Sequence, residues 1–174
     1  MSWSCTNSRY KDDVYDRIWY YSSEYGFKRP DISRGNASLL IRNSYELPTI
    51  VMSTAVTSVT PSTPLDFSWE ADNVNDQYYL YMHFKEVEKL AANETRSFNI
   101  TLNDKFWYDN VTPSISTSTT AYSTKPLTGA TKYQVYLFKT ENSTLPPILN
   151  AYEVYKVKDF SQSETQQDDG KLAL

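Results

Sequence analysis

The segment from Tyr78 to Phe84 constrains the fold of this chain more than any other part of its sequence. Its alternation places large apolar side chains on one face of an extended strand: Tyr78, Leu80, Met82 and Phe84. The opposite face carries amphipathic rings: Tyr79, Tyr81 and His83. A strand that is apolar or amphipathic on both faces is typical of the centre of a β-sandwich, where both sides are covered. The segment therefore predicts a central strand of a sandwich.

Composition favours the same fold class. The chain has 15 tyrosines and only 4 glycines among 174 residues, and aromatic and β-branched residues prefer the half-buried surface of a sheet. The length suits one domain, or slightly more, with a sizeable core. The formal net charge of −4, without a basic patch, argues against nucleic acid as a partner. No run of 18 apolar residues occurs, so we expect no membrane contact by the chain itself.

Further strands are expected where β-prone residues alternate or cluster between turn signals: Thr49–Thr57, Leu65–Glu70, Ser97–Asn103, Tyr133–Lys139 and Ile148–Val157. Asn103 and Asp104 predict a turn into Lys105–Tyr108. Residues 85–93 fit a helical turn or a loop, and residues 114–128 fit an edge strand with a long loop or a loop alone. Short strands without a long helix predict an all-β fold, an antiparallel β-sandwich or jelly roll.

The start of the chain is polar and rich in tyrosine. The segment Arg9–Trp19 mixes charged and large aromatic side chains, and we expect Ile18 and Trp19 to pack into a core while the charges stay in water. Residues 1–5 lack a secretory signal, which predicts either a fragment or a chain whose signal has been removed. Cys5 is the only cysteine, so no intrachain disulfide can form.

Asparagine-linked glycosylation signals indicate the compartment. The pattern Asn-x-Ser/Thr, with x not proline, occurs at five positions: Asn36, Asn93, Asn99, Asn110 and Asn142. Asn99 is expected to point outward from its strand and Asn142 to lie in a loop, as glycosylation requires. The signals favour the secretory pathway and a glycoprotein.

Residues that suggest catalysis or metal binding each have a simpler interpretation. His83 is the only histidine and lies mid-strand, so we expect it to be packed or hydrogen-bonded rather than a general base, and a zinc site is unsupported. Glu86 and Glu88 allow a glycosidase pair, or else a solvated face or a salt-bridged strand end. The oxygen-rich segment Glu70–Asp76 allows calcium binding but lacks the EF-hand spacing, which favours an ordinary turn. We expect no cofactor and no metal.

Clustered aromatic residues are the candidate ligand contacts. Tyrosine and tryptophan rings stack on sugars and are also favoured at protein interfaces. The candidates are those on one face of the central strand and those beside the predicted turn: Tyr79, Tyr81, His83, Trp107 and Tyr108. The alternative for each of them is packing in the core or on the sheet.

Five ordered patterns carry a family resemblance. They are the D-x-x-D-R-I-W element ending at Trp19, P-x-x-V-M-x-T-A-V ending at Val56, Y-Y-x-Y-x-H-F-x-E-V-E at Tyr78–Glu88, T-R-x-F-x-I at Thr95–Ile100 and S-T-L-P-P-I-L-N-A-x-E-x-Y at Ser143–Tyr155. Together they cover about residues 9–157 and resemble the malectin-like ectodomain of plant leucine-rich-repeat receptor-like kinases. The resemblance implies a sandwich of the malectin type and no enzyme activity, since the kinase of that family lies outside this chain.

The resemblance also implies a domain organisation. Such ectodomains have two tandem lobes, so residues 1–45 are expected to be the connecting segment from a missing first lobe, and residues 46–158 the malectin-like lobe. Residues 159–174 are polar and are expected to be a disordered tail. The last five residues, Gly170–Leu174, continue no pattern of the chain and are expected to be an altered chain end.

The expected function is that of an extracellular ligand-recognition domain at the plasma membrane, taking part in signalling. Its ligand would be a carbohydrate or a peptide or protein partner, with co-receptor proteins as further partners. One alternative is a structural spacer without sugar binding. A more remote alternative is a glycosidase-like enzyme, which would need two carboxylates across a cleft.

Overall fold

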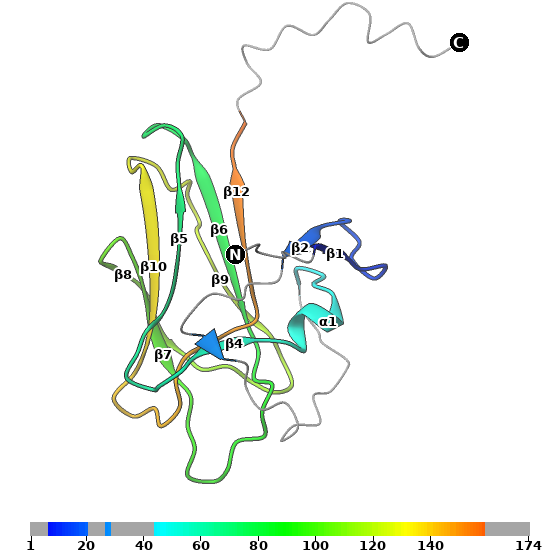
Figure 1. Ribbon diagram of the computed structural model, residues 1–174, viewed down its shortest axis with the longest axis vertical. Coiled ribbons are helices and arrows are strands. Elements are labelled where there is room, and N and C mark those ends of the chain that lie inside the picture. Colours follow the sequence, from blue (N-terminus) through cyan, green and yellow to red (C-terminus); the bar gives the residue numbers. More distant parts are fainter. Residues whose placement is uncertain (1–6, 21–26, 29–43, 159–174) are drawn as a thin grey trace, which may run out of the picture.

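The chain forms two antiparallel sheets that face each other, with smaller elements at their side (Figure 1). The computed structural model describes residues 7–20, 27–28 and 44–158. Its elements are β1 Asn7–Arg9, β2 Ile18–Tyr20, β3 Phe27–Lys28, α1 Thr49–Met52, β4 Val56–Ser58, β5 Leu65–Glu70, β6 Tyr78–Phe84, β7 Phe98–Leu102, β8 Lys105–Val111, β9 Thr119–Tyr122, β10 Lys132–Lys139, β11 Ile148–Leu149 and β12 Ala151–Lys156. The mostly β, antiparallel sandwich predicted from the sequence is confirmed.

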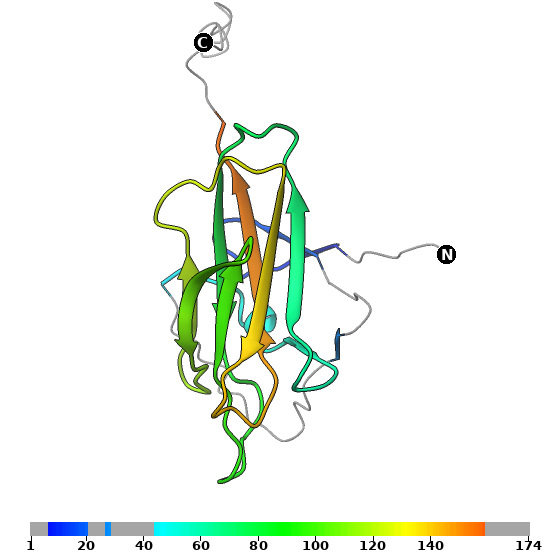
Figure 2. The ribbon, with the colours of Figure 1, turned by 90° about the vertical axis from the view of Figure 1, so that its left-hand side faces the viewer.

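The two large sheets form the layers of the sandwich. One has the strand order β5-β10-β7-β8, and the other has the order β12-β6-β9 (Figure 2). A short third sheet has the order β11-β4-β3, and β1 pairs with β2 in a separate hairpin. β6 is the middle strand of its sheet, and its side chains alternate so that one face meets the core and the other faces outward.

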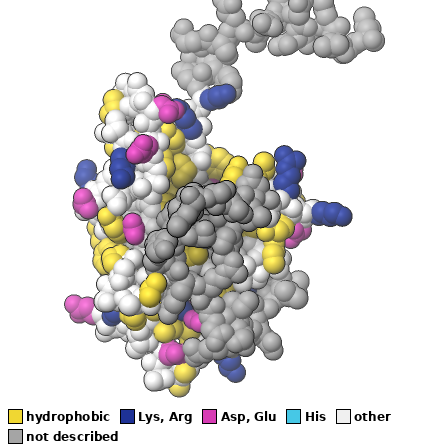
Figure 3. Space-filling view, in the orientation of Figure 1, with side chains coloured by type: hydrophobic (Ala, Val, Ile, Leu, Met, Phe, Trp, Pro, Cys, Tyr) yellow, Lys and Arg dark blue, Asp and Glu magenta, His cyan; other side chains and the backbone are white. Residues whose placement is uncertain are grey.

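The core fills the space between the two large sheets. The inward residues predicted on β6 are all buried, and the rings of Phe84 and Phe98 meet edge to face with centroids 5.2 Å apart. Ile100 of β7 and Leu137 of β10 are fully buried opposite them. On the surface seen in Figure 3, hydrophobic side chains are interspersed with charged ones.

Several local predictions are confirmed by the structure. The strands at Leu65–Glu70 and Tyr78–Phe84 have the predicted bounds. Asn103 and Asp104 connect β7 to β8 with positive φ angles of 47° and 60°, the conformation that two-residue hairpin turns favour. Of the two interpretations of residues 114–128, the edge strand is the one observed, since β9 pairs only with β6 in its sheet. Residues 85–93 contain no helix.

The predicted strand at Thr49–Thr57 is wrong in its first half. Residues 49–52 form the single turn of α1, and only residues 56–58 form a strand. Pro48 begins the turn with a φ of −56°, and its carbonyl accepts the amide hydrogen of Met52 at 3.2 Å. The turn places Val51 and Met52 in the interior, so these apolar residues are buried without forming a strand.

The predicted final strand at Ile148–Val157 is divided between two sheets. Its first part, β11, pairs with β4, and its second part, β12, pairs with β6. Asn150 lies at the crossing, where its Oδ1 accepts the amide hydrogen of Lys85 at 2.6 Å and its Nδ2 donates to the carbonyl of Thr54 at 2.9 Å. The Asn150 side chain thus provides hydrogen-bond partners for the backbone of Lys85 and Thr54 at the point where strand pairing is interrupted.

Within the described residues, no helix is both long and apolar enough to cross a membrane. The predicted tail at residues 159–174 and the glycosylation signal at Asn36 lie outside the described residues.

Candidate functional site

A pocket of about 400 Å³ lies on the outward face of the β12-β6-β9 sheet. Tyrosine rings form most of its wall, together with one arginine, one glutamate and one serine: Tyr15, Arg17, Ser44, Tyr45, Tyr79, Tyr81, Glu153 and Tyr155. A concave site with aromatic walls and a few polar groups is the usual form of a small-ligand site. The pocket is therefore the candidate functional site of the described part of the chain.

The register of two strands sets the base of the pocket. Glu153 of β12 lies opposite Tyr81 of β6, and Tyr155 lies opposite Tyr79. The Tyr81 ring meets the Tyr155 ring edge to face at 5.9 Å, and it meets the Tyr45 ring edge to face at 5.7 Å. Alternation along each strand thus directs all four β6 and β12 side chains to the same outward face.

A chain of charged groups connects the N-terminal hairpin to this face. Arg17 Nε donates to both carboxylate oxygens of Asp13 at 3.0 Å, and Arg17 Nη1 reaches Glu153 at 3.3 Å. Arg17 Nη2 donates to the carbonyl of Glu46 at 2.8 Å. Arg17 therefore connects its own hairpin to two distant segments, residues 45–46 and β12, around the pocket.

The expectation that the charges near the N-terminus stay in water is wrong for Asp13. Its side chain is fully buried and also accepts a hydrogen bond from Trp19 Nε1 at 2.7 Å. Ile18, expected in a core, is 43% exposed, whereas Trp19 is half-buried. Ile18 and Trp19 differ because side chains alternate along β2, so the two point to opposite sides of the strand.

Among the pocket groups whose pKa is shifted, Glu153 and Tyr155 form a hydrogen-bonded pair. Burial acts to raise the pKa of Glu153, but hydrogen bonds from His83 and Tyr155 and the charge of Arg17 outweigh it, so this pKa lies below its ordinary value. Burial, the hydrogen bond that Tyr155 donates to Glu153, and the charge of that carboxylate raise the pKa of Tyr155 to about 12. At neutral pH the glutamate is therefore an anion and the phenol is neutral.

His83 lies beneath the pocket rather than in its wall. Its ring is fully buried, with Nδ1 at 2.9 Å from Thr120 Oγ1 and Nε2 at 3.0 Å from Glu153 Oε1. It is the hydrogen-bonded strand residue that the sequence predicts. Its contact with Glu153 positions that carboxylate from below.

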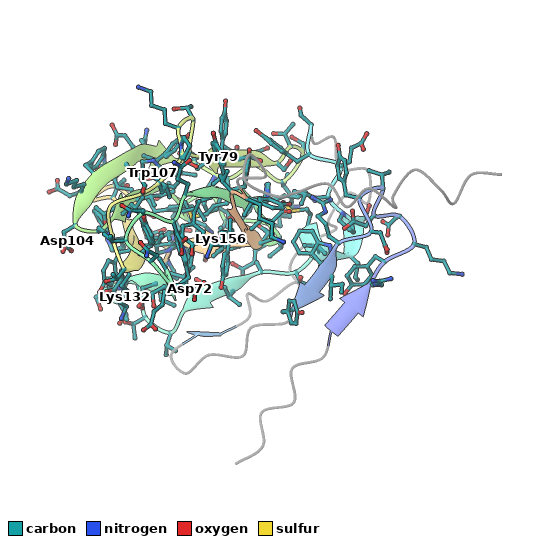
Figure 4. The ribbon with its side chains drawn as sticks, turned by 90° about the horizontal axis from the view of Figure 1, so that it is seen from above. Asp72, Tyr79, Asp104, Trp107, Lys132 and Lys156 are labelled. Atoms are coloured by element: carbon teal, nitrogen blue, oxygen red, sulfur yellow. The ribbon has the colours of Figure 1, made fainter. Side chains whose placement is uncertain are left out.

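Trp107 and Tyr108 lie on β8, in the other large sheet, and neither lines the pocket. Trp107 is half-buried against the core. Tyr108 Oη donates to the carbonyl of Tyr122 at 3.0 Å and accepts the amide hydrogen of the same residue at 3.2 Å. Figure 4 labels Tyr79 and Trp107, which come from different sheets. The five candidate contacts therefore do not form one site.

The acidic pair Glu86 and Glu88 forms a buried ion cluster with Arg96. Arg96 Nε donates to Glu86 at 2.7 Å, Nη2 donates to Glu88 at 2.6 Å, and Nη1 donates to the carbonyl of Pro146 at 2.6 Å. The three charged residues are each at most 8% exposed. Of the sequence interpretations, the salt-bridged one is observed, and the solvated face is wrong.

The oxygen-rich loop at residues 70–76 is closed by a lysine. Lys156 Nζ donates to Asp72 at 2.9 Å and to Asp76 at 2.8 Å, and Figure 4 shows the Asp72 and Lys156 side chains. The hydrogen bond from Lys156 is the main reason that the pKa of Asp76 lies below its ordinary value. Both carboxylates therefore take part in a surface salt bridge of an ordinary turn.

The four described glycosylation signals lie on or near β7 and β8, outside the pocket wall. Asn93, Asn110 and Asn142 are exposed, and Asn99 of β7 is half-buried. Asn99 Oδ1 accepts the amide hydrogen of Asn110 at 2.9 Å. None of these four asparagines lines the pocket.

Most of the pocket wall was not among the sequence candidates. Tyr15, Arg17 and Tyr45 come from segments that the sequence places on no strand face. Glu153 and Tyr155 carried a usable signal, because the same alternation seen in β6 continues through the x-E-x-Y ending of the last pattern.

The comparisons with known proteins agree with this architecture. A family model described as the Malectin-like domain matches residues 1–157. The chain is 40% identical over 172 residues to the "Probable LRR receptor-like serine/threonine-protein kinase At5g59680" and 41% identical over 162 residues to the one named At1g51810, both from Arabidopsis thaliana. These matches cover 97% and 92% of the chain, but the chain spans only 19% and 18% of those relatives.

Solved structures show the same fold at low sequence identity. The ANX2 ectodomain from Arabidopsis thaliana superposes with a TM-score of 0.64 at 16% identity, over 89% of this chain and 48% of that one. A chain in the crystal structure of plant peptide RALF23 in complex with FER and LLG2 superposes with a TM-score of 0.63 at 18% identity, over 87% of this chain and 46% of that one.

Proposed function

The chain belongs to the malectin-like domain family, and on that premise we propose that it is the extracellular ligand-recognition part of a plant receptor-like kinase. Its relatives are kinases of which it spans about a fifth, so in this proposal kinase activity resides elsewhere in the protein. Four exposed or half-exposed glycosylation signals support a secreted location at the outer face of the plasma membrane.

The proposal includes the domain organisation. Residues 46–158 form one malectin-like lobe, and residues 1–45 connect it to a first lobe. The share of the ANX2 ectodomain that the chain covers, 48%, supports a half-ectodomain. The bridge from Arg17 to Glu153 supports a connecting segment that stays attached to the lobe.

The observation that carries the proposed function is the tyrosine-walled pocket. Tyrosine rings offer apolar faces and polar hydroxyls, a combination that suits both the faces of sugars and the side chains of peptides. We propose a carbohydrate or a peptide or protein as the ligand, with co-receptor proteins as further partners. The solved FER structure contains a plant peptide, RALF23, together with LLG2, which supports including these classes.

Binding by this pocket is expected to depend on the β6 and β12 rings. Tyr81→Ala and Tyr155→Ala should each reduce the affinity for a ligand of the pocket about 5- to 30-fold. Each substitution removes about 1 to 2 kcal/mol of binding free energy from contacts with the ring. The ligand would come from a glycan array and a peptide library, with affinities measured by titration calorimetry.

The matched control is Tyr20→Ala, because Tyr20 is 66% exposed on β2 and does not line the pocket. It should leave the affinity unchanged. Equal losses for all three variants would place the ligand elsewhere. Folded protein that binds nothing in either library would favour the structural spacer instead.

Glycosylation is the test of the extracellular location. When the chain is secreted from plant cells, enzymatic deglycosylation should lower its mass. The Asn142→Gln variant should carry one glycan fewer, as measured by intact mass spectrometry. Asn75→Gln is the control, because Asn75 is exposed but lacks Ser or Thr two residues later. A secreted chain without any glycan would contradict the prediction.

A further inference from the structure

We propose that the pocket prefers a ligand with a cationic group, such as the Arg or Lys side chain of a peptide, over a neutral or acidic ligand. The inference rests on the proposed function, which leaves the ligand class open. It follows from the ring faces of the wall and from the balance of charge in its base.

The wall offers the rings that a cation needs. Five tyrosines line the pocket, and a cation over the face of a tyrosine ring is attracted by the negative charge of that face. Tyr15 and Tyr155 are 64% and 47% exposed, so part of this ring surface is open to a ligand. A volume of about 400 Å³ holds one long side chain or one sugar unit.

Among the described residues of the wall, Arg17 is the only basic one, and its donors are already engaged. Its nitrogens bond Asp13, Glu153 and the carbonyls of Tyr45 and Glu46. Its guanidinium carbon also lies 5.2 Å from the centre of the Tyr15 ring. An acidic sugar or an acidic side chain would have to displace these partners in order to bind Arg17.

The charges around the base sum to one negative charge. Among the described side chains there, the carboxylates of Asp13 and Glu153 each contribute a formal −1 and the guanidinium of Arg17 contributes +1. Lys156, which follows Tyr155 on β12, is held by Asp72 and Asp76. Because the low-dielectric wall screens these charges weakly, the pocket has a potential that attracts cations.

Glu153 acts through this field rather than through a direct hydrogen bond. Its two oxygens already accept hydrogen bonds from His83, Arg17 and Tyr155. A bound cation would lie over the Tyr81 and Tyr155 rings, with the carboxylate beneath them. Ring contact and charge therefore make separable contributions, which a matched pair of probes can distinguish.

The test uses the 174-residue chain and four capped pentapeptides, Gly-Gly-X-Gly-Gly, in which X is arginine, lysine, citrulline or glutamate. Citrulline keeps the shape of arginine without its charge. By titration calorimetry the arginine and lysine peptides should bind about tenfold more tightly than the citrulline peptide, and the glutamate peptide should bind most weakly. Arginine and citrulline peptides of equal affinity would overturn the inference.

Two variants locate the effect. Glu153→Gln should reduce the preference of arginine over citrulline to about twofold or less, and Tyr81→Leu should weaken both peptides. Circular dichroism confirms that each variant is folded, and Tyr20→Ala is the control that should change nothing. An unchanged preference in folded Glu153→Gln would overturn the role assigned to this carboxylate.

A neutral oligosaccharide, cellotetraose, distinguishes failure of the cation preference from failure of ligand recognition by the pocket. If it binds, depends on Tyr81 and outcompetes the arginine peptide, recognition by the pocket stands and the preference for a cation is overturned. If neither the peptides nor cellotetraose bind the folded chain, the preference and the proposed use of the pocket both fall.

Discussion

Arg96→Met is expected to lower the free energy of unfolding by about 3 to 5 kcal/mol, one of the two largest effects expected for a single substitution in this chain. Arg96 lies between Glu86 and Glu88 with its side chain 2% exposed. Removing it takes the arginine charge away from two buried carboxylates and the guanidinium donor away from the carbonyl of Pro146. Urea unfolding followed by circular dichroism measures the loss.

The matched control applies the same substitution to a surface ion pair. Arg9 contacts Asp16 at 3.2 Å, but their side chains are 63% and 72% exposed. Arg9→Met should therefore change the free energy of unfolding by no more than about 0.5 kcal/mol. Similar losses for Arg9→Met and Arg96→Met would show that the buried cluster contributes nothing beyond a surface pair.

A compensated variant separates charge from packing in the same cluster. Glu86→Gln and Glu88→Gln added to Arg96→Met should recover part of the loss, because the two carboxylate charges that Arg96 balanced are removed with it. The glutamine Oε1 at position 86 can still accept the amide hydrogens of Val87 and Glu88, which Glu86 accepts at 3.0 Å. A triple variant less stable than Arg96→Met would contradict this explanation.

The sequence predicts strands well where burial alternates locally. In β6 and β7 each inward position is apolar, so the side-chain period alone identifies the strand and its face. The turn at Asn103 and Asp104 is also local, because these residues tolerate positive φ angles. No distant contact is needed for these predictions.

The sequence fails where the deciding partner lies far along the chain. Residues 148–157 read as one strand, but Asn150 exchanges hydrogen bonds with Lys85 and Thr54 at the point where the chain changes sheets. Residues 49–52 are β-prone, yet one helical turn after Pro48 buries Val51 and Met52. Periodicity cannot distinguish a short apolar helix from a short strand.

Only a small part of the pocket could be predicted from the sequence, for the same reason. Tyr79 and Tyr81 share a strand face, so their common exposure follows from alternation. Arg17 and Glu153 are separated by 136 residues, and only the fold brings them together. Trp107 and Tyr108 resemble ligand contacts in sequence, but packing and a hydrogen bond to Tyr122 account for them.

The second large effect is expected in the core. Phe84→Ala should lower the free energy of unfolding by about 3 to 5 kcal/mol, through lost burial of the ring and the cavity that remains. Phe84 is fully buried at the end of β6, and its ring contacts that of Phe98 on the opposite sheet. The variant therefore removes a contact that joins the two layers of the sandwich.

Phe106→Ala is the control, since Phe106 lies on β8 with 60% of its surface exposed. Its loss should stay below about 1 kcal/mol. Urea unfolding should also show an unchanged denaturant slope for both variants, because neither alters the surface exposed on unfolding by much. If Phe84→Ala cost no more than Phe106→Ala, the two sheets would not share the core described here, and the pocket on the outer face of β6 would lose the rigid support that its geometry requires.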